Sequence, residues 1–159
     1  MKIWTTINKT FATAFGLGLS PVAPGTMGAL GGIAIGLWIL NSCPFPNYIL
    51  ILLIVLCTIL GAVSSKILEL EWGDDPSRIV IDEVVGMWIS MLFLPALWEC
   101  YLAAFILFRL FDIFKPLYIK RMEYMKNGWG VMMDDVLAGI YANIILQISI
   151  LVLKKYLLM

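Results

Sequence analysis

Histidine is absent from this chain of 159 residues, and the absence excludes several kinds of catalytic chemistry. Without an imidazole the chain has no Ser-His-Asp triad, no phosphohistidine intermediate, no histidine-ligated zinc and no histidine proton shuttle. Any reaction that the protein catalyses must therefore use carboxylates, lysine and arginine.

Cysteine is scarce, and its spacing excludes cysteine-based sites. Cys43, Cys57 and Cys100 are scattered, odd in number and never in a Cys-x-x-Cys spacing. None is followed six positions later by Arg, so the arrangement of a cysteine phosphatase is missing as well. We expect the three to be small apolar residues, with neither a disulfide framework nor a metal knuckle.

Charged residues are also few, and this scarcity indicates a membrane protein. Only 14% of the residues are charged and 62% are hydrophobic, whereas soluble chains have roughly 25% and 45–50%. Eleven basic residues balance eleven acidic ones. Because binding a polyanion needs a basic excess, this balance argues against a nucleic-acid partner.

Long apolar runs predict an all-α, polytopic membrane bundle that forms a single domain over residues 1–159. No charged residue occurs between Lys9 and Lys66, and a turn at 41–47 divides that stretch. Pro95 and Glu99 mark the junction of a later helical hairpin, and Pro116 ends its second arm. About five transmembrane helices result, at 26–40, 48–65, 84–98, 100–115 and 136–153.

The distribution of Lys and Arg predicts the orientation of the five crossings. Lys154 and Lys155 fall on one side of the membrane. The other side has nine cations, Lys2, Lys9, Lys66, Arg78, Arg109, Lys115, Lys120, Arg121 and Lys126. The side rich in cations should be cytoplasmic. The polar segments 16–28, 66–83 and 109–135 then all lie on this cytoplasmic face.

The first polar segment combines prolines and glycines before an apolar helix. Thr26 is placed to cap that helix, whose free N–H groups would attract an anion such as phosphate; a simple capped turn explains the pattern equally well. Further on, Gly28, Gly32 and Gly36 recur every four residues, a pattern typical of closely packed membrane helices.

Three further segments bring acids and cations to apolar helices. Asp82 and Glu83 are flanked by apolar residues, and acids at that depth need a partner or a metal. Helix-dipole stabilisation explains one of the two well, but not both. The other charged residues are Arg109 and Asp112, Lys115 on the same helical row, and the pair Asp134 and Asp135 at the start of the last helix.

An ion pair between Arg109 and Asp112 is a sufficient structural explanation of that motif, yet an isolated pair in an apolar helix stabilises little. The combination on one membrane face has a clearer chemical meaning. Carboxylates are the ligands that Mg²⁺ takes, usually shared with phosphate and water. Arg and Lys suit phosphate oxygens.

Four ordered blocks resemble the phosphatidylglycerophosphatase A family: FGLGLSPVAPGTMG, DDPSRIVIDEVVG, FRLFDIFKP and GWGVMMDDVLAG. They extend over nearly the whole chain. The resemblance implies a Mg²⁺-dependent enzyme of the bacterial inner membrane that removes the terminal phosphate of phosphatidylglycerophosphate, giving phosphatidylglycerol and phosphate. By position it implicates Asp82, Glu83, Arg109, Asp112, Lys115, Asp134 and Asp135.

The chemistry of these residues leads to a hypothesis about their roles. Mg²⁺ would be held by Asp82, Glu83, Asp134 and Asp135. Asp112 would be a further ligand or the base that activates water, and Arg109, Lys115 and Thr26 would bind phosphate. Attack by a carboxylate through an acyl-phosphate stays open, although no Asp-x-Asp-x-(Thr/Val) signature is present.

Two other functions are compatible with a small acidic membrane protein. A CDP-alcohol phospholipid transferase would also need Mg²⁺, but its DG..AR........G...D...D pattern is missing. A non-enzymatic transporter subunit or ion pathway would use intramembrane charges such as Arg109 and Asp112. Clustering of the charges toward one face disfavours a path through the membrane.

Overall fold

Every regular element that the structure describes is a helix, which confirms the predicted all-α class. The computed structural model describes residues 2–73 and 77–157, so Asp74, Asp75 and Pro76 of the second polar segment lie outside the described residues. In chain order the elements are α1 (Lys2–Ala12), the 3-10 helix η1 (Leu17–Leu19), α2 (Pro24–Ser42), α3 (Pro46–Trp72), α4 (Ile81–Met91), α5 (Trp98–Phe114), α6 (Ile119–Met122) and α7 (Trp129–Leu157).

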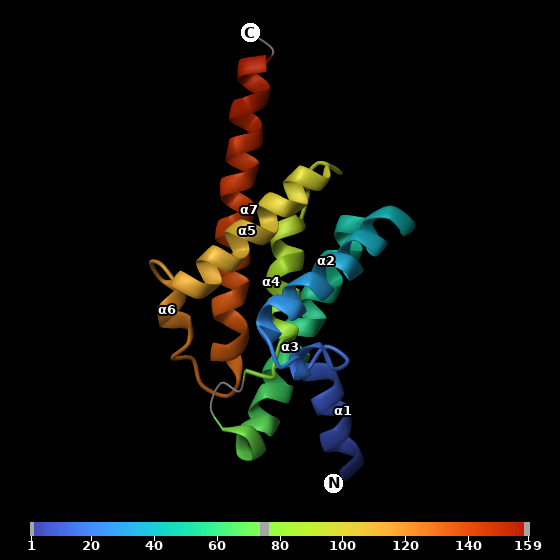
Figure 1. Cartoon of the computed structure of the whole chain (residues 1–159), viewed down its shortest axis with the longest axis vertical. Coiled ribbons are helices and arrows are strands. Elements are labelled where there is room, and N and C mark those ends of the chain that lie inside the picture. The colour runs from blue at the N-terminus through green and yellow to red at the C-terminus, as the bar shows by residue number, and fades with distance from the viewer. Residues whose placement is uncertain (1, 74–76, 158–159) are drawn as a thin grey trace.

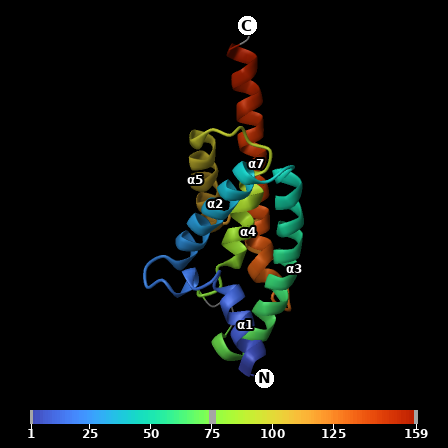
Figure 2. The same cartoon turned by 90° about the vertical axis from the view of Figure 1, so that its right-hand side faces the viewer.

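Helix α4 lies at the centre of the bundle. It packs against α2, α3, α5 and α7, which surround it in Figures 1 and 2. All of its eleven residues except Glu83 are buried. A helix that is apolar on nearly every side belongs in an interior, and this explains why α4, the shortest of the five main helices, occupies the middle.

The five main helices alternate in direction. In Figure 1, α2, α4 and α7 run from the lower part of the view upward, while α3 and α5 run back down. The two termini lie at opposite ends of the molecule (Figures 1 and 2). One end of the bundle therefore gathers the starts of α2, α4 and α7 and the finish of α5, and we call it the acidic end because Asp82, Asp112 and Asp134 lie there.

All five apolar segments predicted from the sequence are helical, but several boundaries are wrong. The third segment ends at Met91 rather than Trp98, because a residue that precedes a proline, here Leu94 before Pro95, avoids the helical region. Helix α7 begins at Trp129, so Asp134 and Asp135 lie in its second turn and not at its start. The short helices α1, η1 and α6 were not predicted.

Among the described residues, three helices are long and apolar enough to cross a membrane, by length and composition. They are Pro24–Ser42, Pro46–Glu69 and Trp129–Tyr156. Helix α4, with eleven residues, is only about 16 Å long, well short of a hydrocarbon core of about 30 Å. Helix α5 has 17 residues and carries Arg109 and Asp112 near its end. The expected count of five transmembrane helices is therefore not confirmed.

Glycines let α4 approach its neighbours closely, as the four-residue glycine spacing predicted. A Cβ atom added at Gly28 would lie 2.8 Å from Val80 Cβ, and one at Gly32 would lie 3.2 Å from Met87 Cβ. The indole N–H of Trp88 donates a hydrogen bond of 2.9 Å to the Gly32 carbonyl. On the opposite side, a Cβ at Gly139 of α7 would collide with the Gly86 carbonyl oxygen of α4.

Replacing Gly32 with Leu should destabilise the bundle, because the new side chain would meet the α4 backbone: the Val84 Cα lies 3.2 Å from a Cβ at this position. Overpacking of this kind costs about 1–3 kcal/mol, which corresponds to a fall in Tm of about 2–12 °C in a chain of this size. The check is thermal unfolding in detergent. Ala34→Leu, at an exposed position of the same helix, is the matched control and should melt like the wild type. Equal melting of both variants would contradict the close contact of α2 with α4.

Candidate active site

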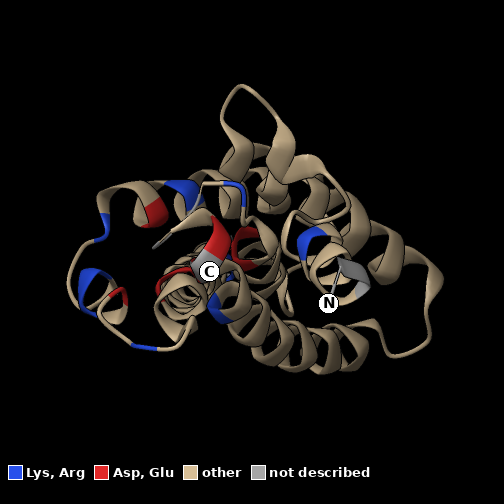
Figure 3. Cartoon of the chain, turned by 90° about the horizontal axis from the view of Figure 1, so that it is seen from below, with Lys and Arg blue, Asp and Glu red and all other residues tan. Residues whose placement is uncertain are grey.

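Three helices bring five carboxylates to the acidic end. Asp82 and Glu83 lie in the first turn of α4, Asp112 in the last turn of α5, and Asp134 and Asp135 in the second turn of α7. Seen from this end, basic segments lie along the rim at α6, and acidic segments lie both beside them and further in (Figure 3). The antiparallel order of the helices thus assembles residues that are far apart in the sequence.

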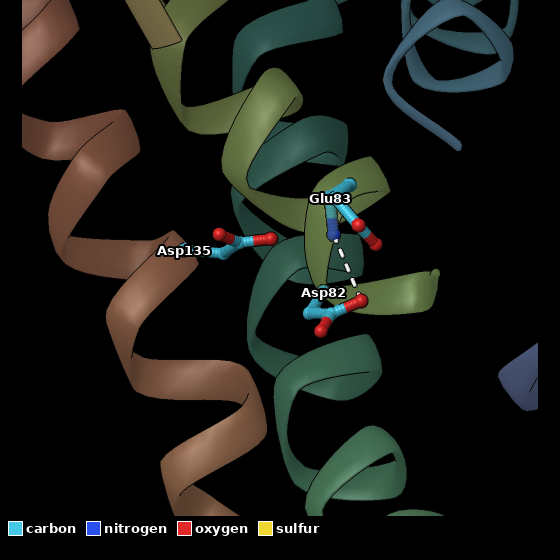
Figure 4. A group of neighbouring side chains, drawn as sticks. All are labelled: Asp82, Glu83 and Asp135. Atoms are coloured by element: carbon cyan, nitrogen blue, oxygen red, sulfur yellow. Dashed lines mark hydrogen bonds between the residues drawn. The ribbon is translucent and has the colours of Figure 1, made fainter. Parts of the chain in front are cut away.

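Asp82, Glu83 and Asp135 form the tightest group of acids. Each offers one carboxylate oxygen, and these oxygens all lie within 4.8 Å of one another. Figure 4 shows the Asp135 side chain of α7 reaching toward the first turn of α4, where the Glu83 N–H donates a hydrogen bond of 3.1 Å to Asp82 Oδ1. Only 8% of Asp82 and 3% of Asp135 is exposed. Three like charges this close and this buried repel strongly unless protons or a cation neutralise them.

The chemistry of this acid group fits a hard divalent cation. Glu83 Oε2 is buried and has no hydrogen-bond partner among the described residues. Carboxylate oxygens at such mutual distances can bind one cation together, and Mg²⁺ is usually bound through a few carboxylates plus water and phosphate. The group has the donor atoms, the burial and the unpaired acceptor that a metal ligand set needs.

Arg109 and Asp112 form an ion pair beside the acid group. Arg109 Nη1 lies 2.5 Å from Asp112 Oδ2, one helical turn away on α5. Asp112 also interacts electrostatically with Glu83 and Asp135, so it belongs to the same charge network. Arg109 Nε is buried without a partner in the described part of the chain. The guanidinium therefore keeps donor capacity for a further acceptor.

Lys115 is the second cation of the site. It ends α5 in a left-handed conformation, with φ 45°, and its ammonium lies 2.7 Å both from Asp134 Oδ2 and from Glu123 Oε1. Burial alone would lower the pKa of Lys115, but the hydrogen bonds and charges of Asp134 and Glu123 outweigh burial and raise it above its ordinary value. Lys115 is therefore firmly charged at neutral pH.

Asp134 lies outside the tight acid group, although the sequence placed it with the other three candidate ligands; its charge still acts on Asp82 and Asp135. Its Oδ2 pairs with Lys115, and its Oδ1 is buried without a partner among the described residues. Glu123, the other partner of Lys115, was missed by sequence reasoning. It lies in the segment between α6 and α7, which has no motif, and only the fold brings it to Lys115.

The start of α2 approaches the acids so closely that a side chain at Gly25 would displace Glu83. A Cβ atom at Gly25 would collide with Glu83 Oε1 and would lie 3.2 Å from Arg109 Nη1. Thr26 is half-buried in the same turn, but it is not the helix cap, because α2 begins at Pro24 with Ala23 as its N-cap. The first N–H groups of a helix lack partners within the helix, so this turn presents positive dipole charge beside Glu83 and Arg109.

A polar cavity of about 550 Å³ adjoins the site between α3 and the start of α7. Asp134, Glu123 and Lys126 are among its lining residues, as is Ser65, whose Oγ is buried without a partner in the described part of the chain. Gly128, with φ 76°, approaches α3 here so closely that a Cβ would meet the Ala62 carbonyl. The cavity leads from loops at the acidic end to Asp134.

The amino-acid sequence that forms this site matches a known protein family. A family model described as Phosphatidylglycerophosphatase A matches residues 10–150. The chain belongs to the phosphatidylglycerophosphatase A family. It is thus an enzyme, a phosphatase, as expected from the four sequence blocks. The match extends from α1 to α7 and includes every residue of the candidate site.

Three relatives show how far the similarity extends. The chain is 42% identical over 137 residues to "Phosphatidylglycerophosphatase A" of Haemophilus influenzae, with 84% of this chain and 83% of the relative covered. It is 38% identical over 133 residues to the protein of that name in Escherichia coli, covering 81% and 75%. It is 49% identical over 144 residues to "Putative phosphatidylinositol-3-phosphatase" of Bacteroides thetaiotaomicron, covering 86% and 89%. No solved structure matches the chain.

Replacing Gly25 with Ala should impair this phosphatidylglycerophosphatase A family enzyme without unfolding it. The added methyl group would displace the flexible end of Glu83 and disturb Arg109. A displacement of about 1 Å at reacting groups costs about 10²-fold in rate, so phosphatase activity should fall by about that factor while Tm stays unchanged. Gly31→Ala is the control, because its Cβ would meet only the mobile end of Leu17. Full activity of Gly25→Ala would mean that the contact with Glu83 has no catalytic consequence.

Proposed function

We propose that this protein hydrolyses the terminal phosphomonoester of phosphatidylglycerophosphate, giving phosphatidylglycerol and phosphate, with Mg²⁺ as cofactor. The observation that carries the proposal is the group Asp82, Glu83 and Asp135, flanked by Arg109, in a chain of the phosphatidylglycerophosphatase A family. Relatives that are 42% and 38% identical have the name of this activity.

Mg²⁺ would be held by Asp82, Glu83 and Asp135, with Asp134 as a fourth ligand through its unpaired Oδ1. Two observations support this set of ligands. The three acids have carboxylate oxygens within 4.8 Å of one another, and Glu83 and Asp134 each have a buried oxygen without a partner among the described residues. A bound divalent cation supplies positive charge for phosphate oxygens and lowers the pKa of a water molecule. The side chains of α4 and α7 fix where that charge lies relative to the substrate.

The substrate phosphate would be bound by Arg109, by Lys115 and by the first turn of α2. Arg109 has an unpaired Nε and lies beside Gly25, so it can donate to phosphate oxygens from the side of α2. Lys115 contributes a second positive charge through its position next to Asp134. Thr26 adds its hydroxyl group and a backbone N–H from the first turn of α2. Together these groups offset the two negative charges of a phosphomonoester.

Asp112 is the candidate base. It is held in place by Arg109 and lies in the charge network of Glu83 and Asp135. In the proposed reaction Asp112 accepts a proton from water, the water oxygen bonds to phosphorus, and the bond from phosphorus to the glycerol oxygen breaks. The glycerol oxygen takes up a proton as it leaves, which regenerates the Asp112 carboxylate and gives the free alcohol of phosphatidylglycerol. The developing charge on the phosphate oxygens is stabilised by Arg109 and Lys115.

The membrane arrangement that we propose has five crossings in the bacterial inner membrane, with the acidic end in the cytoplasm. The alternating directions of α2, α3, α4, α5 and α7 and the opposite positions of the termini support it. Helices α4 and α5 would cross together, since α4 is enclosed by its neighbours and need not meet lipid. Nine Lys and Arg residues on the acidic side, counted from the sequence, support the orientation.

A phosphoinositide is the second candidate substrate. It is favoured by the 49% identity to a protein named for phosphatidylinositol-3-phosphate hydrolysis. Both lipids present a phosphomonoester on a polyol head group, so the same acids and cations would serve either. A CDP-alcohol transferase or an ion pathway is disfavoured by membership of a phosphatase family.

Purified protein should release phosphate from phosphatidylglycerophosphate in mixed micelles with Mg²⁺, and EDTA should abolish the release. Asp135→Ala should lower kcat by at least about 10²-fold, because it removes charge that is directed at the reaction centre. Glu99→Gln, at an exposed acid of the opposite end of α5, is the control and should stay fully active.

A parallel assay with phosphatidylinositol 3-phosphate distinguishes the two lipids. Release that is insensitive to EDTA, or full activity of Asp135→Ala, would refute the proposal.

Mg²⁺ should also stabilise the protein in the absence of substrate. A ligand that binds only the folded state adds about 2.7 kcal/mol at a hundred times its Kd, so Tm should rise with Mg²⁺ concentration. The rise should be lost in Asp82→Asn, since the cation would lose a buried oxygen ligand. Glu99→Gln should keep the full shift. An identical shift in Asp82→Asn would place the metal elsewhere.

A further inference from the structure

A second cavity, of about 410 Å³, lies between α2 and α5 and shares no lining residue with the polar one. It is apolar and open to the outside of the bundle, and Leu30 and Trp98 are among its exposed walls. Its lining from α2 is Leu30, Ile33, Leu37 and Asn41, and its lining from α5 and the preceding loop is Ala96, Trp98, Tyr101, Leu102 and Phe105. We call it the α2–α5 groove.

The walls of the α2–α5 groove continue directly to the phosphate-binding residues. On α5, Tyr101 and Phe105 are spaced by four residues, and the next position of that row is Arg109. On α2, the position one turn before Leu30 is Thr26. The two helices meet at that end, where a Cβ at Gly25 would lie 3.2 Å from Arg109 Nη1. The groove thus leads to the acidic end from the lipid-facing side.

The dimensions of the groove suit one hydrocarbon chain. From Leu30 to Asn41 the axis of α2 rises by about 16 Å, close to half of a hydrocarbon core of about 30 Å. Spread over that length, 410 Å³ corresponds to a mean cross-section of about 25 Å². A helix with a diameter of about 10 Å has a cross-section of about 80 Å², so the groove is too narrow to enclose a helix from a second copy of the chain.

We propose that the α2–α5 groove holds an acyl chain of the phospholipid substrate, which reaches the site sideways from the bilayer between α2 and α5. This rests on the proposed function, because it assigns the apolar part of the same substrate. The acyl chain lies against Leu37 and Phe105, and the anionic head group lies one turn further on, at Arg109 and Thr26. A lipid is the occupant that matches both an apolar groove and the cationic residue at its end.

The proposal is tested by comparing substrates that differ only in chain length. Leu37→Trp fills the part of the groove far from Arg109, which a short acyl chain does not reach, and Ile35→Trp is the control at an exposed position of α2 outside the groove. For dipalmitoyl phosphatidylglycerophosphate, kcat/KM of Leu37→Trp should fall at least about tenfold, the effect of withdrawing about two methylene groups from apolar contact. For the dihexanoyl lipid, and for Ile35→Trp with either lipid, kcat/KM should match the wild type.

Two outcomes separate this inference from the proposed function. If the wild type releases phosphate from both lipids and Leu37→Trp affects them equally, the groove does not hold the acyl chain while the proposed function stands. If the wild type hydrolyses neither lipid, the proposed function itself fails. A dipalmitoyl substrate with a diazirine in one acyl chain gives a readout that does not depend on turnover. Its cross-links should map to Tyr101, Leu102 or Phe105, and cross-links confined to α3 or α7 would overturn the assignment.

Discussion

The repulsion among buried carboxylates is the constraint on which the rest of this structure depends. Asp82, Glu83 and Asp135 bring their oxygens within 4.8 Å of one another in a chain that is otherwise apolar. Such a group costs folding free energy unless positive charge lies beside it. Arg109 supplies some of that charge from α5, and the start of α2 adds its dipole where Gly25 approaches Glu83. A divalent cation would supply the remainder. The carboxylates whose repulsion lowers the stability of the fold are therefore the same ones that would bind the metal in the proposed reaction.

Small residues make this arrangement possible. The acids come from α4 and α7, and these helices approach closely because Gly86 and Gly139 have no side chains at their contact. Gly28 and Gly32 do the same between α2 and α4. Without a hydrophobic driving force between helices in lipid, such close van der Waals contact is what holds them together. The glycines therefore have a structural role, close helix packing, and a consequence for the site, because this packing sets the distances between the carboxylates.

The two cavities give the site an aqueous side and a lipid side. The polar cavity adjoins Asp134 among the loops of the acidic end, while the apolar groove ends one turn from Arg109. A phospholipid with a phosphorylated head group likewise has a polar end, the head group, and an apolar end, the acyl chains. Water and the released phosphate would use the polar side, and the diacylglycerol part would stay in the bilayer. This explains how a site can bury its carboxylates in a membrane protein and still exchange soluble ligands.

The helical class, the five apolar segments and the family could be predicted from the sequence, because they follow from composition, periodicity and ordered motifs; the acids and cations proposed for the site came from the same motifs. The packing of the helices accounts for the short, central α4, for the pairing of Asp134 with Lys115, and for the positions of Glu123 and Gly25 beside the site. The tertiary structure also decided that Thr26 is not the cap of α2. The physical reason is the same in each case: these features depend on the distances between helices, and such distances arise from packing between segments far apart in the chain.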